Sequence, residues 1–400
     1  MPERAHDVPR YEVIIVGGGA IGSSIAFFLA GQDAFNGSVA VVEKDPTYSY
    51  CATMRSAGAI RQQFSTPENI EICKFGTEFL RTAAENLAVG DQRPDVFFHE
   101  GGYLLLATEK GLPILEQNHA LQSSHGVEVI VLSPEEMRER FPWLHVSDLA
   151  AGSLGLRGEG WFKVHNLLMA LRAKAEDLGA DYLEGEVVGI ERQGAAVRGV
   201  KLADGRELRC DAIVNAAGAR AAEIAALAGI DGFPVESRKR LIFTLEGGDA
   251  VRNSPLVVDT SGVYFRPEED GQFICGISPP DERDPVSHDF VVDHDIFEDL
   301  ILPNLVHRVP AFREHGLGKS WAGHYAVNPH DHNAILGAHP EVGNFYLANG
   351  FSGHGLQQAP AVGRALSELI AFGSYQTLDL SRFAFDRFAS GKLVHERNVI

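Results

Sequence analysis

Near the N-terminus, a short apolar strand runs into a glycine-rich turn and then a helix, and this unit constrains the fold more than any other stretch. Residues 13–16 form an apolar run too short for a buried helix, so they predict a buried parallel strand. Gly17, Gly19 and Gly22 follow in the spacing G-x-G-x-x-G, with an apolar helical stretch over residues 21–29. The first glycine permits a tight turn, the second lets a phosphate approach the backbone, and the third lets helix and strand pack closely.

An acidic residue completes this unit. A second apolar strand, residues 39–42, ends in Glu43, about 20 residues beyond the glycines, where a carboxylate accepts hydrogen bonds from ribose hydroxyls. The alternative is a glycine turn that binds nothing, but strand, turn, helix, strand and acid in this order predict a site for an adenine dinucleotide. The residues expected to contact it here are Gly17, Gly19, Ala20, Ile21, Gly22, Glu43 and Lys44.

Length, charge and cysteine content narrow the class of protein. The chain has 400 residues, which predicts two domains, and its net charge of −19 argues against nucleic acid or an anionic membrane as the main partner. No apolar run approaches the roughly 20 residues of a transmembrane helix, and residues 1–10 lack the apolar core of a secretory signal. The cysteines form no C-x-x-C pair, so we expect reduced thiols and a cytoplasmic protein.

A second glycine-rich turn lies near the C-terminus. Residues 345–348 predict a strand, and Gly350, Gly353 and Gly355 surround His354. A helix is expected from about residue 358, with Pro360 in its first turn. Because the unpaired N–H groups at the start of a helix attract negative charge, we expect this turn to contact a ligand as well.

Three segments together resemble the D-amino-acid-oxidase superfamily of FAD enzymes, and the resemblance spans nearly the whole chain. They are the unit of residues 17–43, the Asn-Ala-Ala-Gly turn of residues 215–218 and the Phe-Ser-Gly-His-Gly run of residues 351–355. Arg61 and the Trp-Ala-Gly-His-Tyr run of residues 321–325 are more similar to sarcosine and dimethylglycine oxidases and dehydrogenases. The C-terminal part is also similar to the FAD-dependent oxidoreductase-domain protein of complex I assembly.

The resemblance implies an α/β fold, α+β overall, in which a Rossmann-like FAD-binding domain is interleaved with an antiparallel-sheet substrate domain. We expect the FAD-binding domain to comprise residues 1–93, 142–233 and 327–400, and the substrate domain residues 94–141 and 234–326. Some family members attach flavin covalently through a histidine or a cysteine, at positions that here hold Arg55 and Gly323, so FAD is expected to be non-covalent. Further expected FAD contacts are Arg55, Ser56, Ala57, Gly58, Val188, Ala217, Gly218, Gly350, Ser352, Gly353, His354, Gly355, Leu356 and Gln357.

The same resemblance implies that the substrate is a small amino acid. Arg61 is expected to bind its carboxylate through the planar guanidinium, with Tyr325 and Tyr264 on the opposite wall. Hydride transfer from an N-substituted amino acid to flavin N5 would give an iminium that water hydrolyses, without a strong general base. The alternatives are a D-amino acid, disfavoured because related oxidases have arginine in place of Tyr325, and a 2-hydroxy acid, which needs a base such as His324 or His354.

Other features bear on the electron acceptor and on rival functions. Oxidases of the sarcosine type keep lysines beside the flavin, whereas the strand over residues 273–276 has none and Gln357 stands in place of another, so a dehydrogenase with a quinone or protein acceptor is expected. The aromatic residues of the tail, residues 377–400, motivate the alternative of a scaffold protein that keeps FAD as a structural element. His330 and His332 have no further ligand at suitable spacing, so no metal is expected.

Overall fold

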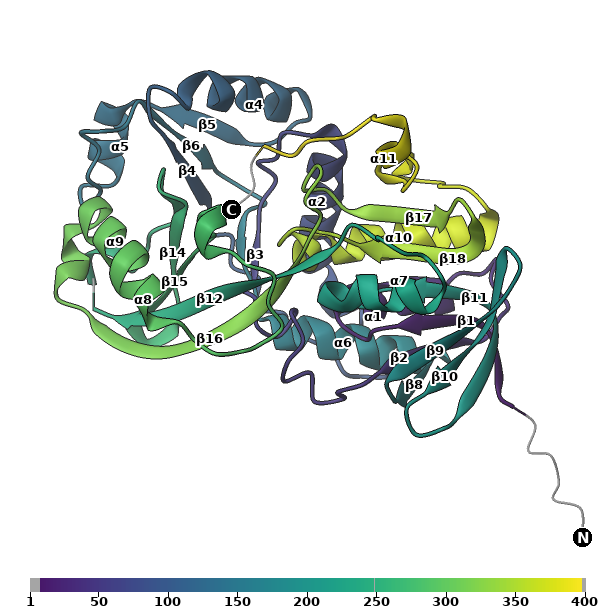
Figure 1. Ribbon diagram of the computed structural model, residues 1–400. Coiled ribbons are helices and arrows are strands. Elements are labelled where there is room, and N and C mark those ends of the chain that lie inside the picture. The colour runs from purple at the N-terminus through teal and green to yellow at the C-terminus, as the bar shows by residue number, and fades with distance from the viewer. Residues whose placement is uncertain (1–7, 248, 398–400) are drawn as a thin grey trace, which may run out of the picture.

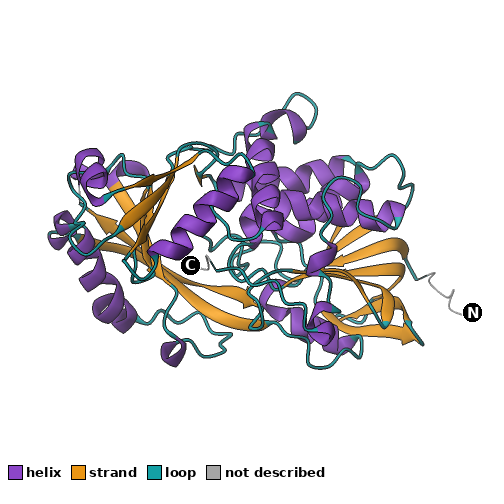
Figure 2. Cartoon of the chain, turned by 90° about the horizontal axis from the view of Figure 1, so that it is seen from above, coloured by secondary structure: helices purple, strands orange, loops and turns teal. Residues whose placement is uncertain are grey.

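The computed structural model describes residues 8–247 and 249–397, so the expectations for residues 1–7 and 398–400 lie outside the described part. The described strands form two eight-stranded sheets at opposite sides of the molecule (Figure 1; Figure 2). A small pair, β3 (Ala59–Ile60) with β7 (Gly160–Trp161), lies outside both sheets. The predicted α/β class, with one Rossmann-like part and one largely antiparallel part, is confirmed.

The first sheet is the Rossmann-like one. Its main path runs β17-β18-β11-β1-β2-β8, and β10 and β9 extend it from β11 as an antiparallel ribbon. β18, β11, β1, β2 and β8 are parallel to one another, which requires crossover connections between them. The bounds are β1 Arg10–Val16, β2 Val39–Glu43, β8 Asp181–Glu184, β9 Val187–Gln193, β10 Ala196–Leu202, β11 Glu207–Asn215, β17 Ile335–His339 and β18 Val342–Asn349.

Both faces of this sheet are buried, because apolar residues follow one another along its strands. In β1, Val13 and Ile15 belong to a core shared with α1 and α10, while Ile14 and Val16 belong to a core shared with α7 and the β9–β10 ribbon. Each such side chain contributes roughly 1.5–3 kcal/mol by leaving water. The covering helices are α1 Ala20–Ala30, α2 Pro67–Arg81, α6 Val164–Asp177, α7 Ala221–Leu227 and α10 Gly355–Phe372.

The second sheet has the order β16-β12-β15-β14-β13-β4-β6-β5. Its neighbouring strands are antiparallel except for β13 and β4, which are parallel. The strands are β4 Tyr103–Ala107, β5 Val129–Leu132, β6 Ala151–Gly155, β12 Glu236–Glu246, β13 Leu256–Val258, β14 Val263–Pro267, β15 Gln272–Ile277 and β16 Gly316–Val327. The helices beside them or between the sheets are α3 Ala83–Asn86, α4 Leu112–Ser124, α5 Pro134–Arg140, α8 His294–Ile296 and α9 Leu302–Arg308, and α11 Arg387–Ser390 lies in the tail.

One expected domain boundary is wrong. The division at residue 142 assigns residues 151–155 to the FAD-binding domain, yet β6 pairs with β4 on one side and β5 on the other in the second sheet. The first insertion into the Rossmann-like part therefore runs at least through residue 155. The sequence does not reveal this pairing, because β6 follows α5 along the chain whereas its partner β4 lies well before α5.

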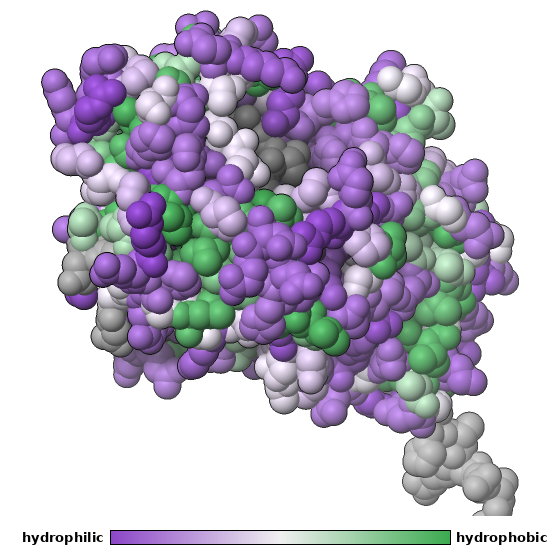
Figure 3. Space-filling view, turned by 60° about the vertical axis from the view of Figure 1, so that its left-hand side comes forward, coloured by the Kyte–Doolittle hydropathy of each residue, from purple (hydrophilic) through white to green (hydrophobic). Residues whose placement is uncertain are grey.

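Two strands of the second sheet reach towards the first. β12 and β16, with 11 and 12 residues, are paired from Glu236–Val327 to Glu246–Gly316 and run from one side of the molecule towards the other (Figure 1). The face shown in Figure 3 is mostly hydrophilic, with apolar residues in small separate groups. Within the described residues, the helices are all too short or too polar to cross a lipid bilayer.

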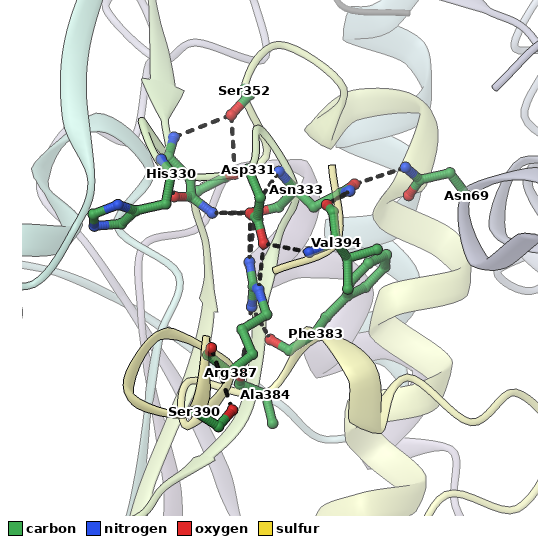
Figure 4. A network of polar contacts seen from close by, with 12 residues as sticks. Asn69, His330, Asp331, Asn333, Ser352, Phe383, Ala384, Arg387, Ser390 and Val394 are labelled. Atoms are coloured by element: carbon green, nitrogen blue, oxygen red, sulfur yellow. Dashed lines mark hydrogen bonds and ion pairs between the residues drawn. The ribbon is translucent and has the colours of Figure 1, made fainter. Parts of the chain in front are cut away.

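The C-terminal tail is joined to the first sheet through a buried carboxylate (Figure 4). Asp331 is fully buried, and its two oxygens accept hydrogen bonds from Arg387 at 2.7 and 2.9 Å, from Asn328 at 2.6 Å and from the Val394 amide at 3.0 Å. A buried carboxylate is tolerated when its lone pairs are satisfied in this way. The tail is therefore an integral part of the Rossmann-like side of the molecule.

We predict that Arg387→Ala lowers the free energy of unfolding by about 3–5 kcal/mol, because it leaves the Asp331 charge buried without its cation. Arg382, in the same tail, provides the control: it is more than half exposed and pairs with Glu68, so Arg382→Ala should cost less than about 1 kcal/mol. Urea denaturation of both variants measures the difference. Equal destabilisation would contradict the assigned role of the Asp331–Arg387 pair.

Candidate active site

One cavity of about 580 Å³ extends from the glycine turn after β1 to the β12–β16 strand pair. Most of the expected site residues line it: Gly17, Gly19, Ala20, Ile21, Glu43, Lys44, Arg55, Ser56, Ala57, Val188, Ala217, Gly218, Tyr264, His324, Tyr325, Gly353, Gly355 and Leu356. The others do not face it: Gly22, Gly58, Arg61, Gly350, Ser352, His354 and Gln357.

The glycine turn has the geometry of a phosphate-binding loop. Gly17 has φ +104°, and a Cβ atom there would lie 2.6 Å from the Ala216 carbonyl oxygen. A Cβ atom on Gly22 would lie 1.8 Å from the Gly17 carbonyl oxygen, so α1 can meet β1 only with glycine at this position. Gly19 is the residue before α1, and its backbone faces the cavity. The start of α1 thus presents its N–H groups to the cavity.

Glu43 lies at the end of β2, beside this turn. Its Oε2 accepts a hydrogen bond from the Gly18 amide at 2.8 Å and its Oε1 accepts one from the Asp45 amide at 2.9 Å. These bonds fix the carboxylate at the cavity wall. The remaining lone pairs can accept hydrogen bonds from ribose hydroxyls, as expected from the sequence.

The second helix start at the cavity is that of α10, and it begins earlier than expected. Gly355 is its first residue and His354 precedes it, so Pro360 is the sixth residue rather than part of the first turn. The helix therefore lacks the hydrogen bond that an N–H at residue 360 would donate to the Leu356 carbonyl. Tyr325 packs on the turn: a Cβ atom on Gly353 would lie 2.3 Å from its ring.

Arg61 lies behind this turn and does not line the cavity. It is 2% exposed, and its guanidinium donates a hydrogen bond to Nε2 of His354 at 3.2 Å and lies over the ring of Phe64. Its amide donates to Oε1 of Gln357 at 2.9 Å. Burial and the Arg61 charge hold the pKa of His354 well below its usual range, so this imidazole is neutral with Nε2 accepting. Arg61 supports the start of α10 and adds positive charge there.

Tyr325 and His324, both expected to be catalytic, point to opposite sides of β16, as neighbours on a strand must. Tyr325 lies under Arg240, whose guanidinium carbon is 5.1 Å from the ring centre. His324 instead packs edge-on against Phe290, with ring centres 4.5 Å apart, and burial lowers its pKa. Tyr264 lines the cavity too, and burial raises the pKa of both tyrosines, so their hydroxyls stay protonated at neutral pH.

Arg55 and Gly323 stand at the two positions where some family members attach the flavin covalently, and these positions lie side by side. Arg55 and Gly323 both line the cavity, and a Cβ atom on Gly323 would lie 3.1 Å from the Cβ of Arg55. Arg55 donates hydrogen bonds to the carbonyls of Ser49 and Ala322, both at 2.8 Å. Its guanidinium and the hydrogen-only side chain of Gly323 offer no nucleophile for such a link.

Several lining residues were not singled out in the sequence. Arg240, Ser237 and Ile242 come from β12, and His288 and Phe290 come from the loop before α8. The only signal for Arg240 was its place in a strand-rich segment, which gave no indication of the face it would occupy. Its orientation depends on the pairing of β12 with β16, about 85 residues further along the chain.

Comparison with known proteins agrees with this geometry. The sequence matches the DAO family, described as FAD dependent oxidoreductase, over residues 12–369. The chain belongs to this family. It is 41% identical to FAD-dependent oxidoreductase domain-containing protein 1 of Xenopus laevis, over 98% of this chain and 86% of that protein. It is 27% identical to the mitochondrial dimethylglycine dehydrogenase of Homo sapiens, over 91% of this chain and 43% of that protein.

A solved structure is similar over the same length. L-proline dehydrogenase from P. horikoshii has a TM-score of 0.85 and 29% identity, over 97% of this chain and 100% of that one. FAD is the cofactor of the family, and the residues of this FAD dependent oxidoreductase fit it. The backbone at Gly17 and Gly19 leaves room that a Cβ atom would fill, Glu43 is fixed for ribose, and the start of α10 faces the same cavity.

We predict that Gly19→Val prevents FAD binding while the chain still folds. The Cβ atom would lie 3.1 Å from Oγ1 of Thr53 and 3.2 Å from Sγ of Cys51, which can adjust, but the valine methyls would occupy the place of the pyrophosphate. Gly343→Val is the matched control, because the Gly343 Cβ position has no atom within 4 Å. Flavin released by acid precipitation, relative to polypeptide, should be near zero for the first variant and normal for the second.

A buried carboxyl group near Arg61 predicts a pH dependence of stability. Glu159 is fully buried, accepts hydrogen bonds from the Gln62 and Gln63 amides at 2.6 and 3.0 Å, and has its pKa raised to about 7 by burial. The folded chain therefore binds an extra proton between about pH 4.5 and 7, and this stabilisation is lost as the pH rises through 7.

Relative to Glu159→Gln, the wild-type free energy of unfolding should fall by about 3 kcal/mol between pH 4.5 and pH 8. Denaturation curves of both proteins at the two pH values measure this difference. Glu135→Gln, a change at an exposed glutamate of α5, should follow the wild type at both values. A pH-independent difference between wild type and Glu159→Gln would show that Glu159 keeps one protonation state throughout.

Proposed function

We propose that this FAD dependent oxidoreductase dehydrogenates a small amino acid whose nitrogen is a secondary or tertiary amine. FAD supplies the acceptor for a hydride equivalent when it is bound. The observation that carries the proposal is the position of the imidazoles. His324 lines the cavity but points to the other side of β16 from Tyr325, and His354 has its Nε2 engaged by Arg61. A 2-hydroxy acid needs a base beside the reacting carbon, whereas a neutral amine does not.

The relatives support an N-substituted substrate. Dimethylglycine, in the name of one relative, carries a tertiary amine, and L-proline, in the name of the similar structure, carries a secondary one. Both are small amino acids with a single carboxylate. In the cavity of this chain, Tyr264 and Tyr325 provide aromatic walls and hydroxyl donors, which suit a small substrate with a carboxylate.

The residues of this chain would contribute by positioning and by charge. The start of α10, with Arg61 behind it, stabilises negative charge that develops at the adjoining part of the cavity. The positive charge of Arg240 favours loss of the substrate ammonium proton, which must precede oxidation. Tyr264 and Tyr325 exclude water and orient the reacting carbon.

An acceptor other than oxygen, a quinone or a protein, is part of the proposal. Lys44 is the one lysine among the residues described as lining the cavity, and it lies beside Glu43 at the glycine-turn end. His324 and His354, which could replace a lysine as the cation beside the flavin, both have lowered pKa values and are neutral. The proposal is therefore that neither a lysine nor a protonated imidazole stabilises the small superoxide anion beside the flavin.

We predict that anaerobic addition of sarcosine, dimethylglycine or L-proline bleaches the visible flavin absorbance of the holoenzyme, because these amines need no base. Lactate needs a base, and related D-amino acid oxidases have arginine in place of Tyr325, so lactate and D-alanine should bleach the flavin at least tenfold more slowly. The reduced flavin should then reoxidise slowly in air-saturated buffer and rapidly with a soluble quinone.

Each outcome separates this function from a rival. Bleaching by lactate alone would favour a hydroxy acid dehydrogenase, and rapid reoxidation in air would make the protein an oxidase. If no small metabolite bleached the flavin, the alternative of a scaffold protein with structural FAD would stand instead.

A further inference from the structure

Two histidines and one aspartate meet beside the second sheet, away from the cavity. His145 and Asp148 lie in the segment between α5 and β6, and His307 lies in α9. One nitrogen of each imidazole and one oxygen of the carboxylate lie within 4.8 Å of one another. α9 is on the side of the second sheet that faces away from the first sheet (Figure 1), and these three described residues are not among those that line the cavity. The group is therefore separate from the FAD cavity.

A buried arginine holds this group in place. Arg308 is 1% exposed and donates to both oxygens of Asp148, at 2.8 and 2.9 Å, and to Asp259 at 2.5 Å. It also donates to the His145 carbonyl, and the His145 amide donates to the Arg308 carbonyl at 2.9 Å. These bonds join the two chain segments and fix the Asp148 carboxylate before any ligand binds. A ligand set fixed in this way loses little conformational entropy on binding.

The distances between the three side chains suit a metal ion. Nε2 of His307 lies 3.3 Å from Oδ2 of Asp148, and the rings of His145 and His307 meet edge to face with centres 4.7 Å apart. A tetrahedral zinc ion, with bonds of about 2.0–2.1 Å, places neighbouring ligand atoms about 3.3 Å apart. The His307–Asp148 pair already has this spacing, and rotation of the His145 side chain brings in the third ligand. The hydrogen bond of that ring with the exposed Ser147 hydroxyl, at 2.7 Å, is readily exchanged for one with water.

Charge and exposure also favour a cation. With both imidazoles in the neutral form that binds metal, the carboxylates of Asp148 and Asp259 face one guanidinium, so the group carries one net negative charge. The side chains of Asp148 and His307 are 40% and 47% exposed, which leaves room for entry of an ion and for water ligands. Two imidazole nitrogens and one carboxylate oxygen suit Zn²⁺ and similar transition-metal ions, whereas Mg²⁺ and Ca²⁺ prefer oxygen ligands alone.

We propose that His145, Asp148 and His307 bind one divalent transition-metal ion of the zinc type, with water completing the coordination. The ion joins the segment before β6 to α9 and stabilises the part of the molecule built on the second sheet, apart from the redox reaction. The sequence did not reveal this group because Asp148 and His307 are 159 residues apart, far beyond the spacing of local metal motifs. The expectation of no metal concerned His330 and His332, in another part of the chain.

The test is a calorimetric titration of ZnCl₂ into the holoenzyme, purified without a histidine tag. About one equivalent of zinc should bind tightly, and His307→Ala and His145→Ala should each raise its Kd at least tenfold, because each removes one of the protein ligands. His165→Ala is the matched control. His165 is an exposed histidine of α6 outside the group, so this variant should change the Kd less than about threefold. The flavin content of each variant checks that it is folded.

Two further measurements separate this site from a general attraction of cations to an acidic chain, whose net charge is −19. MgCl₂ should bind at least tenfold more weakly than ZnCl₂, because Mg²⁺ prefers oxygen ligands. Zinc should raise the thermal unfolding temperature of the wild type and of His165→Ala but not that of His307→Ala, because an ion bound to the folded chain stabilises it. The visible absorbance of the bound flavin should stay unchanged.

No zinc binding, equal zinc affinity in the wild type and in either ligand variant, or magnesium binding as tight as that of zinc would overturn the proposal. A zinc-dependent change in the flavin absorbance would also overturn it, because the ion would then lie in the cavity. None of these readouts needs turnover, so they test the metal site whether or not an amine reduces the flavin.

Discussion

The close contact of α1 with the strand before it is the constraint on which the rest of the structure depends. With the Gly17 carbonyl oxygen 1.8 Å from the Cβ position of Gly22, the helix start is fixed at the end of β1. β1 lies between β11 and β2, so the ends of three parallel strands meet there. Asn215 and Glu43 end β11 and β2, and the cavity opens at this carboxyl edge, as it does in other open parallel sheets.

The β12–β16 strand pair divides the other end of the cavity into two chemically different sides. On one side, Tyr325 and Arg240 present hydroxyl and guanidinium donors near the start of α10. On the other, His324 and Phe290 form an aromatic cluster with a neutral imidazole. The Arg55 guanidinium lies over the Phe290 ring, 4.9 Å from its centre, so a cation is present on this second side as well.

Which features could be predicted from the sequence depends on how far apart along the chain the contacting residues lie. The glycine turn, Glu43 and the turn at Gly353 were expected to contact a ligand, and residues of all three line one cavity; each belongs to a strand–turn–helix unit whose geometry is local. Resemblance identified Arg61 as a functional position, but its burial depends on His354 and Phe64 from other segments. The orientation of Arg240 and the place of β6 depend on pairing between distant strands, which the pattern of one strand does not encode.

The tail of the chain has a consequence for the order of events during synthesis. β18 completes the parallel part of the first sheet, and Glu396 accepts hydrogen bonds from Ser65 at 2.9 Å and Asn69 at 3.0 Å at the start of α2. These partners are separated by more than three hundred residues. In a growing chain, the β18 side of β11 therefore stays unpaired until β18, more than one hundred residues further along, has been made. The start of α10 can therefore join the cavity wall only well after the glycine turn that follows β1 has been made.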